Sequence, residues 1–148
     1  MARAETSEVL VLAADDSADD YLLIEQGFRN MERIRLVGRV EDGAEVIAYL
    51  KGEGIYAARQ KFPFPDLLLL DLKMPGIDGL DVLRWLQTQS FPELVVIVLS
   101  GSERREDMNL ALQLGAHYYH TKQIDLAQQI RMFDLFEQYM VRHRRNLD

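Results

Sequence analysis

The chain has 148 residues, of which 48% are hydrophobic, and a formal net charge of −7 at pH 7. This size suits one domain with a packed core, and the acidic balance argues against direct binding to nucleic-acid phosphates. Cysteine is absent, which excludes disulfides, thiolate zinc sites and a cysteine nucleophile. The N-terminus lacks the apolar segment of a signal peptide, and the longest strongly apolar stretch, Leu67 to Leu70, cannot span a membrane. We expect a cytoplasmic single domain over residues 1–148, with a core from about 8 to 140 and no output domain.

Short apolar runs alternate with amphipathic stretches along the chain. The runs that predict strands are 9–14, 34–40, 67–70, 94–99 and 116–119. Ser17 is a suitable N-cap for a first helix with Asp19 and Asp20 in its opening turn, and Gly115 suits the end of the fourth helix. The predicted helices cover residues from Ser17 to about 30, then 43–50, 80–89, 104–114 and 124–144. Residues 51–65 contain two glycines and two prolines and are expected to form a long connection with a helical turn around 56–60.

This alternation predicts an α/β fold, in which helices cover both faces of a parallel sheet. Ligands of such sheets bind outside the carboxyl ends of the strands. The residues expected at that edge are Asp15, Asp16, Asp71, Ser100 and Lys122. Each has an ordinary structural explanation when taken alone, as a helix-capping acid, a polar strand end, a turn residue or a solvated charge. Because the alternation brings all five to one edge, we expect a functional site there.

Three close carboxylates repel one another unless a cation neutralises them. A set of oxygen ligands without histidine or cysteine favours a hard ion, so Mg²⁺ is predicted in preference to zinc. The pairwise spacings of His117, His120 and His143 suit no zinc site. A carboxylate beside Mg²⁺ can attack a phosphoryl donor and form an acyl phosphate. The chemistry therefore favours a phosphoryl-accepting aspartate, with Lys122 and Ser100 as supporting groups.

The sequence resembles the receiver domains of bacterial response regulators over residues from about Glu8 to Met140. Residues 71–79, Asp-Leu-Lys-Met-Pro-Gly-Ile-Asp-Gly, are similar to the family's D-x-x-M-P-x-x-D-G loop. The acidic pair follows the first strand, Ser100 lies 29 residues beyond Asp71, and Lys122 lies 22 residues further on. Tyr119, three residues before that lysine, matches the family's aromatic switch position.

The resemblance implies a flavodoxin-like doubly wound (βα)5 fold with strand order 2-1-3-4-5. It implies that a sensor histidine kinase phosphorylates Asp71. It further implies that Asp16, Asp71 and the backbone carbonyl of Lys73 bind Mg²⁺ directly, while Asp15 acts mainly through water.

The same resemblance implies how the signal leaves the site. Lys122 would pair with the phosphoryl group, Ser100 would move toward it, and Tyr119 would turn inward. The readout would be the face built from the fourth helix, the fifth strand and the last helix.

Two departures from the family pattern stand out. Gln123 replaces the proline that usually follows the lysine, often with a cis bond, so the conformation of the Lys122–Gln123 bond stays open. The connection over 51–65 is longer than the family minimum. Together with the expected lack of an output domain, this longer connection makes the sequence similar to the small regulators that pair with phytochrome-type histidine kinases.

The last predicted helix carries two apolar stripes. Its core face is expected at Leu126, Ile130, Phe133, Phe136 and Met140, and a second stripe consists of Met132, Leu135 and Tyr139. The second stripe could be scattered surface residues, but we favour a partner or homodimer surface.

Two other functions compete with this interpretation. A haloacid-dehalogenase-like phosphatase or transferase would need a second aspartate two residues after its nucleophile, where this chain has Lys73. A receiver-like scaffold that signals without phosphorylation would have lost an acid or the lysine, and both are present. We therefore expect a phosphoacceptor switch and not an enzyme with a separate substrate.

Overall fold

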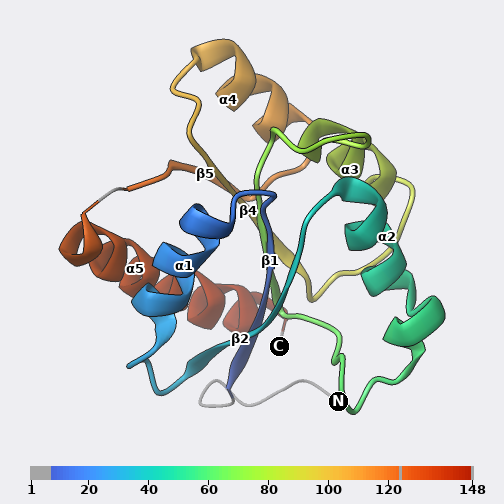
Figure 1. Cartoon of the computed structure of the whole chain (residues 1–148), viewed down its shortest axis with the longest axis horizontal. Coiled ribbons are helices and arrows are strands. Elements are labelled where there is room, and N and C mark those ends of the chain that lie inside the picture. Colours follow the sequence, from blue (N-terminus) through green and yellow to red (C-terminus); the bar gives the residue numbers. More distant parts are fainter. Residues whose placement is uncertain (1–7, 124, 148) are drawn as a thin grey trace.

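The computed structural model describes residues 8–123 and 125–147. Figure 1 shows a central sheet between two groups of helices. The strands are β1 (Val9–Ala14), β2 (Ile34–Val40), β3 (Leu67–Leu70), β4 (Val95–Ser100) and β5 (Tyr118–Thr121). The helices are α1 (Ala18–Phe28), α2 (Gly43–Lys51), α3 (Gly79–Leu86), α4 (Arg105–Gln113) and α5 (Leu126–Leu147), with a 3-10 turn η1 (Gly54–Ala57). In this part of the chain, no helix has both the length and the apolar character needed to cross a bilayer.

The five strands are parallel and follow the order β2-β1-β3-β4-β5, so the flavodoxin-like prediction is confirmed. The three central strands are almost completely buried, because both faces of the sheet are covered. A strand that is buried on both faces needs apolar residues at successive positions, and these three strands have such continuous apolar sequences. A strand with one face in water would instead alternate apolar and polar residues.

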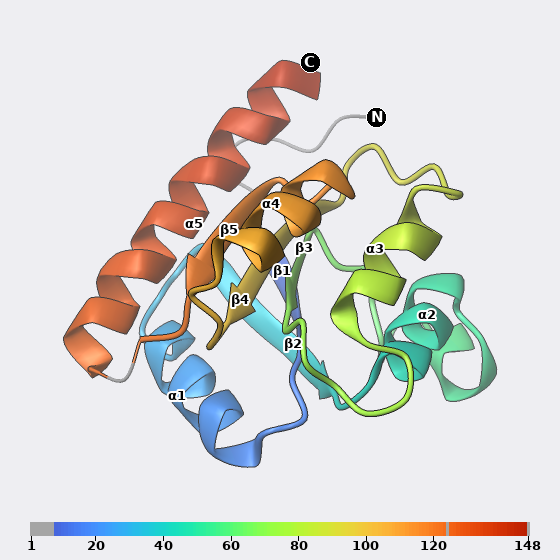
Figure 2. The ribbon, with the colours of Figure 1, turned by 90° about the horizontal axis from the view of Figure 1, so that it is seen from above.

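Two hydrophobic layers hold the helices against the sheet, and Figure 2 shows α1 and α5 on one side with α2 and α3 on the other. In the first layer, Phe133 of α5 stacks on Phe28 of α1, with ring centroids 4.0 Å apart. In the second, Val82 and Leu83 of α3 and Ala111 of α4 pack against the opposite face of the sheet. Helices therefore cover both faces of the sheet.

The fifth strand begins two residues later than the sequence predicted. Gly115 adopts φ = 103° at the end of α4, and the N–H of Ala116 donates to the carbonyl of Ala111 at 3.0 Å. These two residues therefore complete the helix end, as the glycine indicated, and cannot pair in the sheet. The strand runs to Thr121, which places Lys122 directly after its carboxyl end.

The predicted division of α5 into a core stripe and a surface stripe is wrong at three positions. Met132 is only 8% exposed and belongs to the core, whereas Leu126 and Ile130 are 43% and 39% exposed. The buried face also includes two polar residues, Gln129 and Arg144. It is therefore rotated toward Met132 relative to the face that hydrophobic spacing predicted. The Arg144 guanidinium lies 3.4 Å from the Asp66 carboxylate, so its charge is compensated inside the protein.

Candidate phosphoacceptor site

The register of the sheet brings the acids of two strand ends together. Ala14 pairs with Leu70, and the N–H of Asp71 continues the ladder by donating to the carbonyl of Ala14 at 3.0 Å. Carboxylate oxygens of Asp15, Asp16 and Asp71 consequently lie within 4.8 Å of one another. Asp15 and Asp71 are buried and Asp16 is exposed. The predicted convergence of these three carboxylates is therefore present.

The loop after β1 is fixed by local hydrogen bonds and by one arginine. Ser17 caps α1 as predicted, and its own N–H donates to Asp15 Oδ1 at 2.9 Å. From the end of β2, the Arg39 guanidinium donates to the backbone carbonyls of Asp15 at 3.0 Å and Asp16 at 3.1 Å. Its carbon also lies 5.6 Å from the centre of the Tyr21 ring. Sequence reasoning missed Arg39, which clamps the acidic pair.

The loop after β3 turns tightly beneath Asp71. The N–H of Lys73 donates to Asp71 Oδ1 at 3.2 Å, and Asp78 forms a capping box with Asp81 at the start of α3. A Cβ on Gly79 would lie 2.7 Å from the Leu72 Cα and still closer to the Asp71 carbonyl oxygen. Only glycine lets the backbone at position 79 come this close to the backbone of Asp71 and Leu72. This steric limit explains why glycine follows Asp78 in the motif. The Lys73 side chain itself is exposed.

The Lys122 ammonium contacts three carboxylates. Its Nζ lies 2.9 Å from Asp15 Oδ2, 2.9 Å from Asp71 Oδ2 and 2.7 Å from Asp20 Oδ2. Burial disfavours the charged form, but hydrogen bonds to Asp20, Asp71 and Asp15 outweigh it and raise the pKa of Lys122. Asp20 was expected only as a favourable charge in the first turn of α1. Its contact with Lys122 joins residues 102 positions apart.

Ser100 is the last residue of β4, and Tyr119 lies within the neighbouring strand β5. The buried Ser100 hydroxyl accepts from the N–H of Ser102 at 3.3 Å, and its carbonyl accepts from the N–H of Lys122 at 2.9 Å. The Tyr119 hydroxyl donates to the carbonyl of Ser102 at 2.8 Å. Asp107 of α4 accepts from the Ser102 hydroxyl at 2.6 Å. The loop between β4 and α4 therefore links Ser100, Tyr119 and the start of α4. The peptide bond after Lys122 is trans.

The donor set fits a hard divalent cation. The three acids offer oxygen ligands within one small volume, and hard cations such as Mg²⁺ and Mn²⁺ prefer oxygen. Burial raises the pKa of the Asp15 carboxyl, although hydrogen bonds from the Ser17 N–H and from Lys122 oppose the shift. A cation would favour the ionised form of this carboxyl and offset the repulsion between Asp15 and Asp71.

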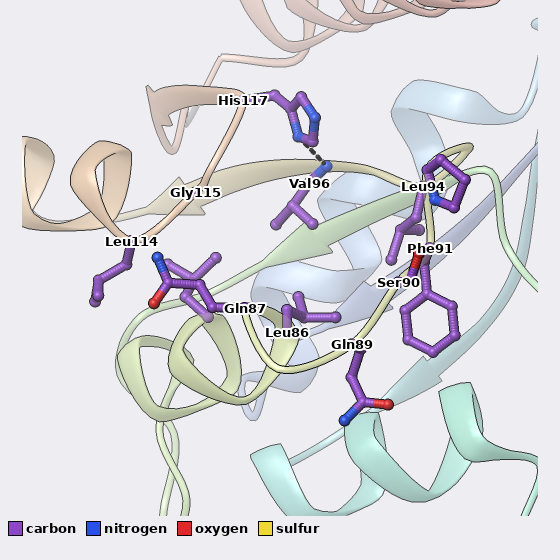
Figure 3. A pocket seen from close by; sticks show the side chains of 12 residues that line it. Leu86, Gln87, Gln89, Ser90, Phe91, Leu94, Val96, Leu114, Gly115 and His117 are labelled. Carbon is purple, nitrogen blue, oxygen red and sulfur yellow. Dashed lines mark hydrogen bonds between the residues drawn. The ribbon is translucent and has the colours of Figure 1, made fainter. Parts of the chain in front are cut away.

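A pocket of about 340 Å³ lies at the opposite end of β4, between α3 and the end of α4 (Figure 3). Leu86, Phe91 and Leu94 supply apolar walls, and His117 Nδ1 accepts a hydrogen bond from the N–H of Val96 at 3.0 Å. None of the predicted site residues lines this pocket. It is therefore separate from the carboxyl-end chemistry.

Two of the three predicted partner-surface residues remain accessible on α5. Leu135 and Tyr139 are half-buried, whereas Met132 is in the core. Tyr139 stacks on Tyr118 of β5 with centroids 3.7 Å apart, and its hydroxyl lies 3.1 Å from His120 Nε2. Tyr139 therefore already has intramolecular partners.

Comparisons with known proteins agree with this geometry. Residues 11–134 match the model of the response regulator receiver domain. The chain is 28% identical to response regulator Rcp1 of Synechocystis over 131 residues, covering 88% of the chain and 87% of Rcp1. It is 35% identical over 129 residues to protein-glutamate methylesterase/protein-glutamine glutaminase 5 of Myxococcus xanthus, covering 87% of the chain but only 34% of that longer protein.

Solved structures give the same result. The phosphorylated cyanobacterial phytochrome response regulator RcpA has a TM-score of 0.79 and 31% identity, over 91% of this chain and 95% of RcpA. RPA3017, from red light signalling of R. palustris, has a TM-score of 0.78 and 32% identity, over 86% of this chain and 90% of RPA3017. The Mn²⁺-bound form of Rcp1 has a TM-score of 0.75 and 27% identity, over 90% of this chain and 94% of Rcp1. With its fold and these matches, the chain belongs to the response regulator receiver domain family.

Proposed function

We propose that the chain is a response regulator switched by Mg²⁺-dependent phosphorylation of Asp71. One observation carries the proposal: the Asp71 carboxylate lies beside the acidic pair and also contacts Lys122 Nζ at 2.9 Å. A nucleophile, a cation-binding group and a fixed positive charge are the parts that phosphoryl transfer to a carboxylate requires. The similar protein RcpA has been solved in its phosphorylated form, which supports the same reaction here.

In the proposed reaction, a carboxylate oxygen of Asp71 attacks the phosphorus of a phosphohistidine on a sensor histidine kinase. An O–P bond forms as the P–N bond breaks, and the electron pair of that bond returns to the kinase imidazole. The product is an acyl phosphate on Asp71. Lys122 pairs with one phosphoryl oxygen, and the Ser100 hydroxyl donates to another. Hydrolysis by water later releases phosphate and restores the carboxylate.

Asp16, Asp71 and the Lys73 carbonyl are proposed to hold Mg²⁺ directly, with Asp15 acting through water. When bound, the ion supplies positive charge that offsets the carboxylates and the charge on the phosphoryl group. The described oxygen cluster and the Mn²⁺-bound form of Rcp1 support this assignment. Arg39 keeps the backbone of the acidic pair in place for the ion.

The signal is proposed to leave through α4, β5 and α5. The Ser100 hydroxyl accepts a hydrogen bond from the N–H of Ser102, and the carbonyl of Ser102 accepts one from the Tyr119 hydroxyl. Movement of the Ser100 hydroxyl toward a phosphoryl oxygen would change this loop, and Tyr119 would follow. A partner protein would respond to phosphorylation only if it binds the two states of this loop with different affinities.

We further propose a phytochrome-type histidine kinase as the phosphoryl donor and the cytoplasm as the place of reaction. RcpA is described as a phytochrome response regulator, and RPA3017 acts in red light signalling. Phosphotransfer from purified phytochrome kinases and from unrelated histidine kinases would test this choice. A markedly faster transfer from the phytochrome kinases is expected, and equal rates would contradict it.

A homodimer through α5 is the remaining part of the proposal, with Leu135 and Tyr139 at the contact. Leu135→Glu leaves the Tyr118–Tyr139 stack in place, so it perturbs the surface more selectively than a change at Tyr139. Sedimentation of the wild type is expected to show a dimer, and the variant a monomer. A wild type that stays monomeric at high concentration, with or without phosphorylation, would contradict the dimer.

The central reaction is tested by incubating the protein with acetyl phosphate and Mg²⁺ and measuring its intact mass. One added phosphoryl group is expected in the wild type and in the exposed-acid control Asp134→Asn, and none in Asp71→Asn. Removal of Mg²⁺ by a chelator should abolish the addition. An unchanged wild-type mass, with acetyl phosphate and with kinase phosphotransfer, would instead support a phosphorylation-independent scaffold.

A further inference from the structure

Within residues 8–123 and 125–147, Asp20 is the one carboxylate in contact with Lys122 that does not belong to the proposed cation-binding trio. Its Oδ2 lies 2.7 Å from Lys122 Nζ, closer than either Asp15 or Asp71 at 2.9 Å. The metal-compatible group consists of Asp15, Asp16 and Asp71. Asp20 therefore contacts the lysine of the site without a place among the proposed ligands of the ion.

Asp20 is held in place by hydrogen bonds from both its backbone and its side chain. Its N–H donates to the Ser17 hydroxyl at 3.2 Å in the cap of α1, and its side chain reaches Lys122 after β5. The Asp20 side chain is 39% exposed, so its carboxylate can leave Lys122 and be hydrated by water at a modest cost in free energy. Its neighbour Asp19 is in the same helical turn and is exposed.

A lysine ammonium has three hydrogen-bond donors, and three carboxylates surround Lys122 in this structure. With a cation bound, Asp15 and Asp71 would turn part of their charge from the ammonium to the ion, and Asp20 would remain as a partner of Lys122. A phosphoryl oxygen that pairs with Lys122 would then have to share the ammonium and its charge with the Asp20 carboxylate. The negative charge of Asp20 also opposes the approach of an anionic phosphoryl group.

We propose that Asp20 is a positioning residue that retains Lys122 in the unphosphorylated protein and competes with the phosphoryl group for it. The proposal rests on the function proposed above, because it assigns Lys122 to the phosphoryl oxygen. Asp20 thereby limits how strongly Lys122 binds the phosphoryl group. Loss of its charge strengthens binding of a phosphoryl group while the cation affinity changes little.

Beryllofluoride, a phosphoryl mimic, provides the test at saturating Mg²⁺. Its dissociation constant is measured for the wild type, Asp20→Asn and the matched control Asp19→Asn, which removes the same charge from the same turn. Asp20→Asn is expected to bind beryllofluoride three- to tenfold more tightly than the wild type, and Asp19→Asn to stay within about twofold. Mg²⁺ affinity, measured separately, should be the same for both variants within about twofold.

A second pair of variants separates competition for Lys122 from a general charge effect. In a Lys122→Ala background, Asp20→Asn should lose its advantage over Asp19→Asn, because no ammonium is left to compete for. If Asp20→Asn binds the mimic no better than Asp19→Asn, or more weakly than the wild type, the competition is refuted. If the wild type itself neither binds beryllofluoride nor gains a phosphoryl group, the proposed function fails and not this inference alone.

Discussion

Gly79→Ala should damage both the stability and the chemistry of the site. A Cβ at this position would lie 2.7 Å from the Leu72 Cα, about 0.7 Å inside the 3.4 Å limit of ordinary contact, and the obstructing atoms are backbone. Because the main chain directly after β3 must move, the cost should reach the 1–3 kcal/mol range of overpacked cores. The displaced segment carries Asp71, so labelling by acetyl phosphate should slow as well.

Urea unfolding followed by circular dichroism measures this cost, and Gly38→Ala is the matched control. A Cβ at Gly38 would meet no atom within 4 Å, and its φ is compatible with alanine. The control should therefore be neutral or stabilised by about 0.4–1 kcal/mol. Equal midpoints and equal labelling rates for the two variants would refute the steric explanation of the Asp-Gly motif.

Three further outcomes are expected. Phe133→Ala should lower the free energy of unfolding by about 3–5 kcal/mol, because the ring is fully buried, whereas Leu126→Ala on the exposed side should change it by less than about 0.5 kcal/mol. Burial and nearby His143 lower the pKa of His117 below 6.5, so as pH falls below that value the unfolded chain takes up a proton before the folded one. Stability should therefore fall as the pH drops below about 6.5, by at most about 1.4 kcal/mol per pH unit for this proton, and His117→Asn should reduce the slope. Arg39→Lys, which cannot bridge two carbonyls with a planar fork, should weaken Mg²⁺ binding about tenfold in calorimetry.

Each of these outcomes has a clear contradiction. Equal unfolding midpoints for Phe133→Ala and Leu126→Ala would conflict with the observed face of α5. A pH slope that is unchanged in His117→Asn would assign the titration to other groups, of which His120 also has a pKa lowered by burial. Wild-type Mg²⁺ affinity in Arg39→Lys would show that the backbone clamp does not support the ion.

The sheet and the gathering of the acids could be predicted because both follow from local patterns. Residues 67–70 are four leucines, and an apolar run of this length before Asp71 indicates a strand buried on both faces. Parallel strands then bring the residues after their carboxyl ends to one edge. The prediction that Asp15, Asp16 and Asp71 converge is confirmed by their carboxylate distances.

The side-chain contacts between distant elements could not be predicted in the same way. Asp20 was expected only as a favourable charge in the first turn of α1, and Arg39 was not singled out, because their partners depend on side-chain directions across the fold. The face of α5 was misjudged because Gln129 and Arg144 are polar and nevertheless buried. Hydrophobic spacing locates a helix well, but compensated polar groups can rotate its buried face.

The most direct test of the central claim is a crystal structure with Mn²⁺ in place of Mg²⁺, in which anomalous scattering locates the ion. We predict one strong peak within coordination distance, about 2.0–2.3 Å, of oxygens from Asp16, Asp71 and the Lys73 carbonyl. A peak elsewhere with this cluster empty, at Mn²⁺ concentrations that support phosphorylation, would contradict the proposed role of the acidic trio.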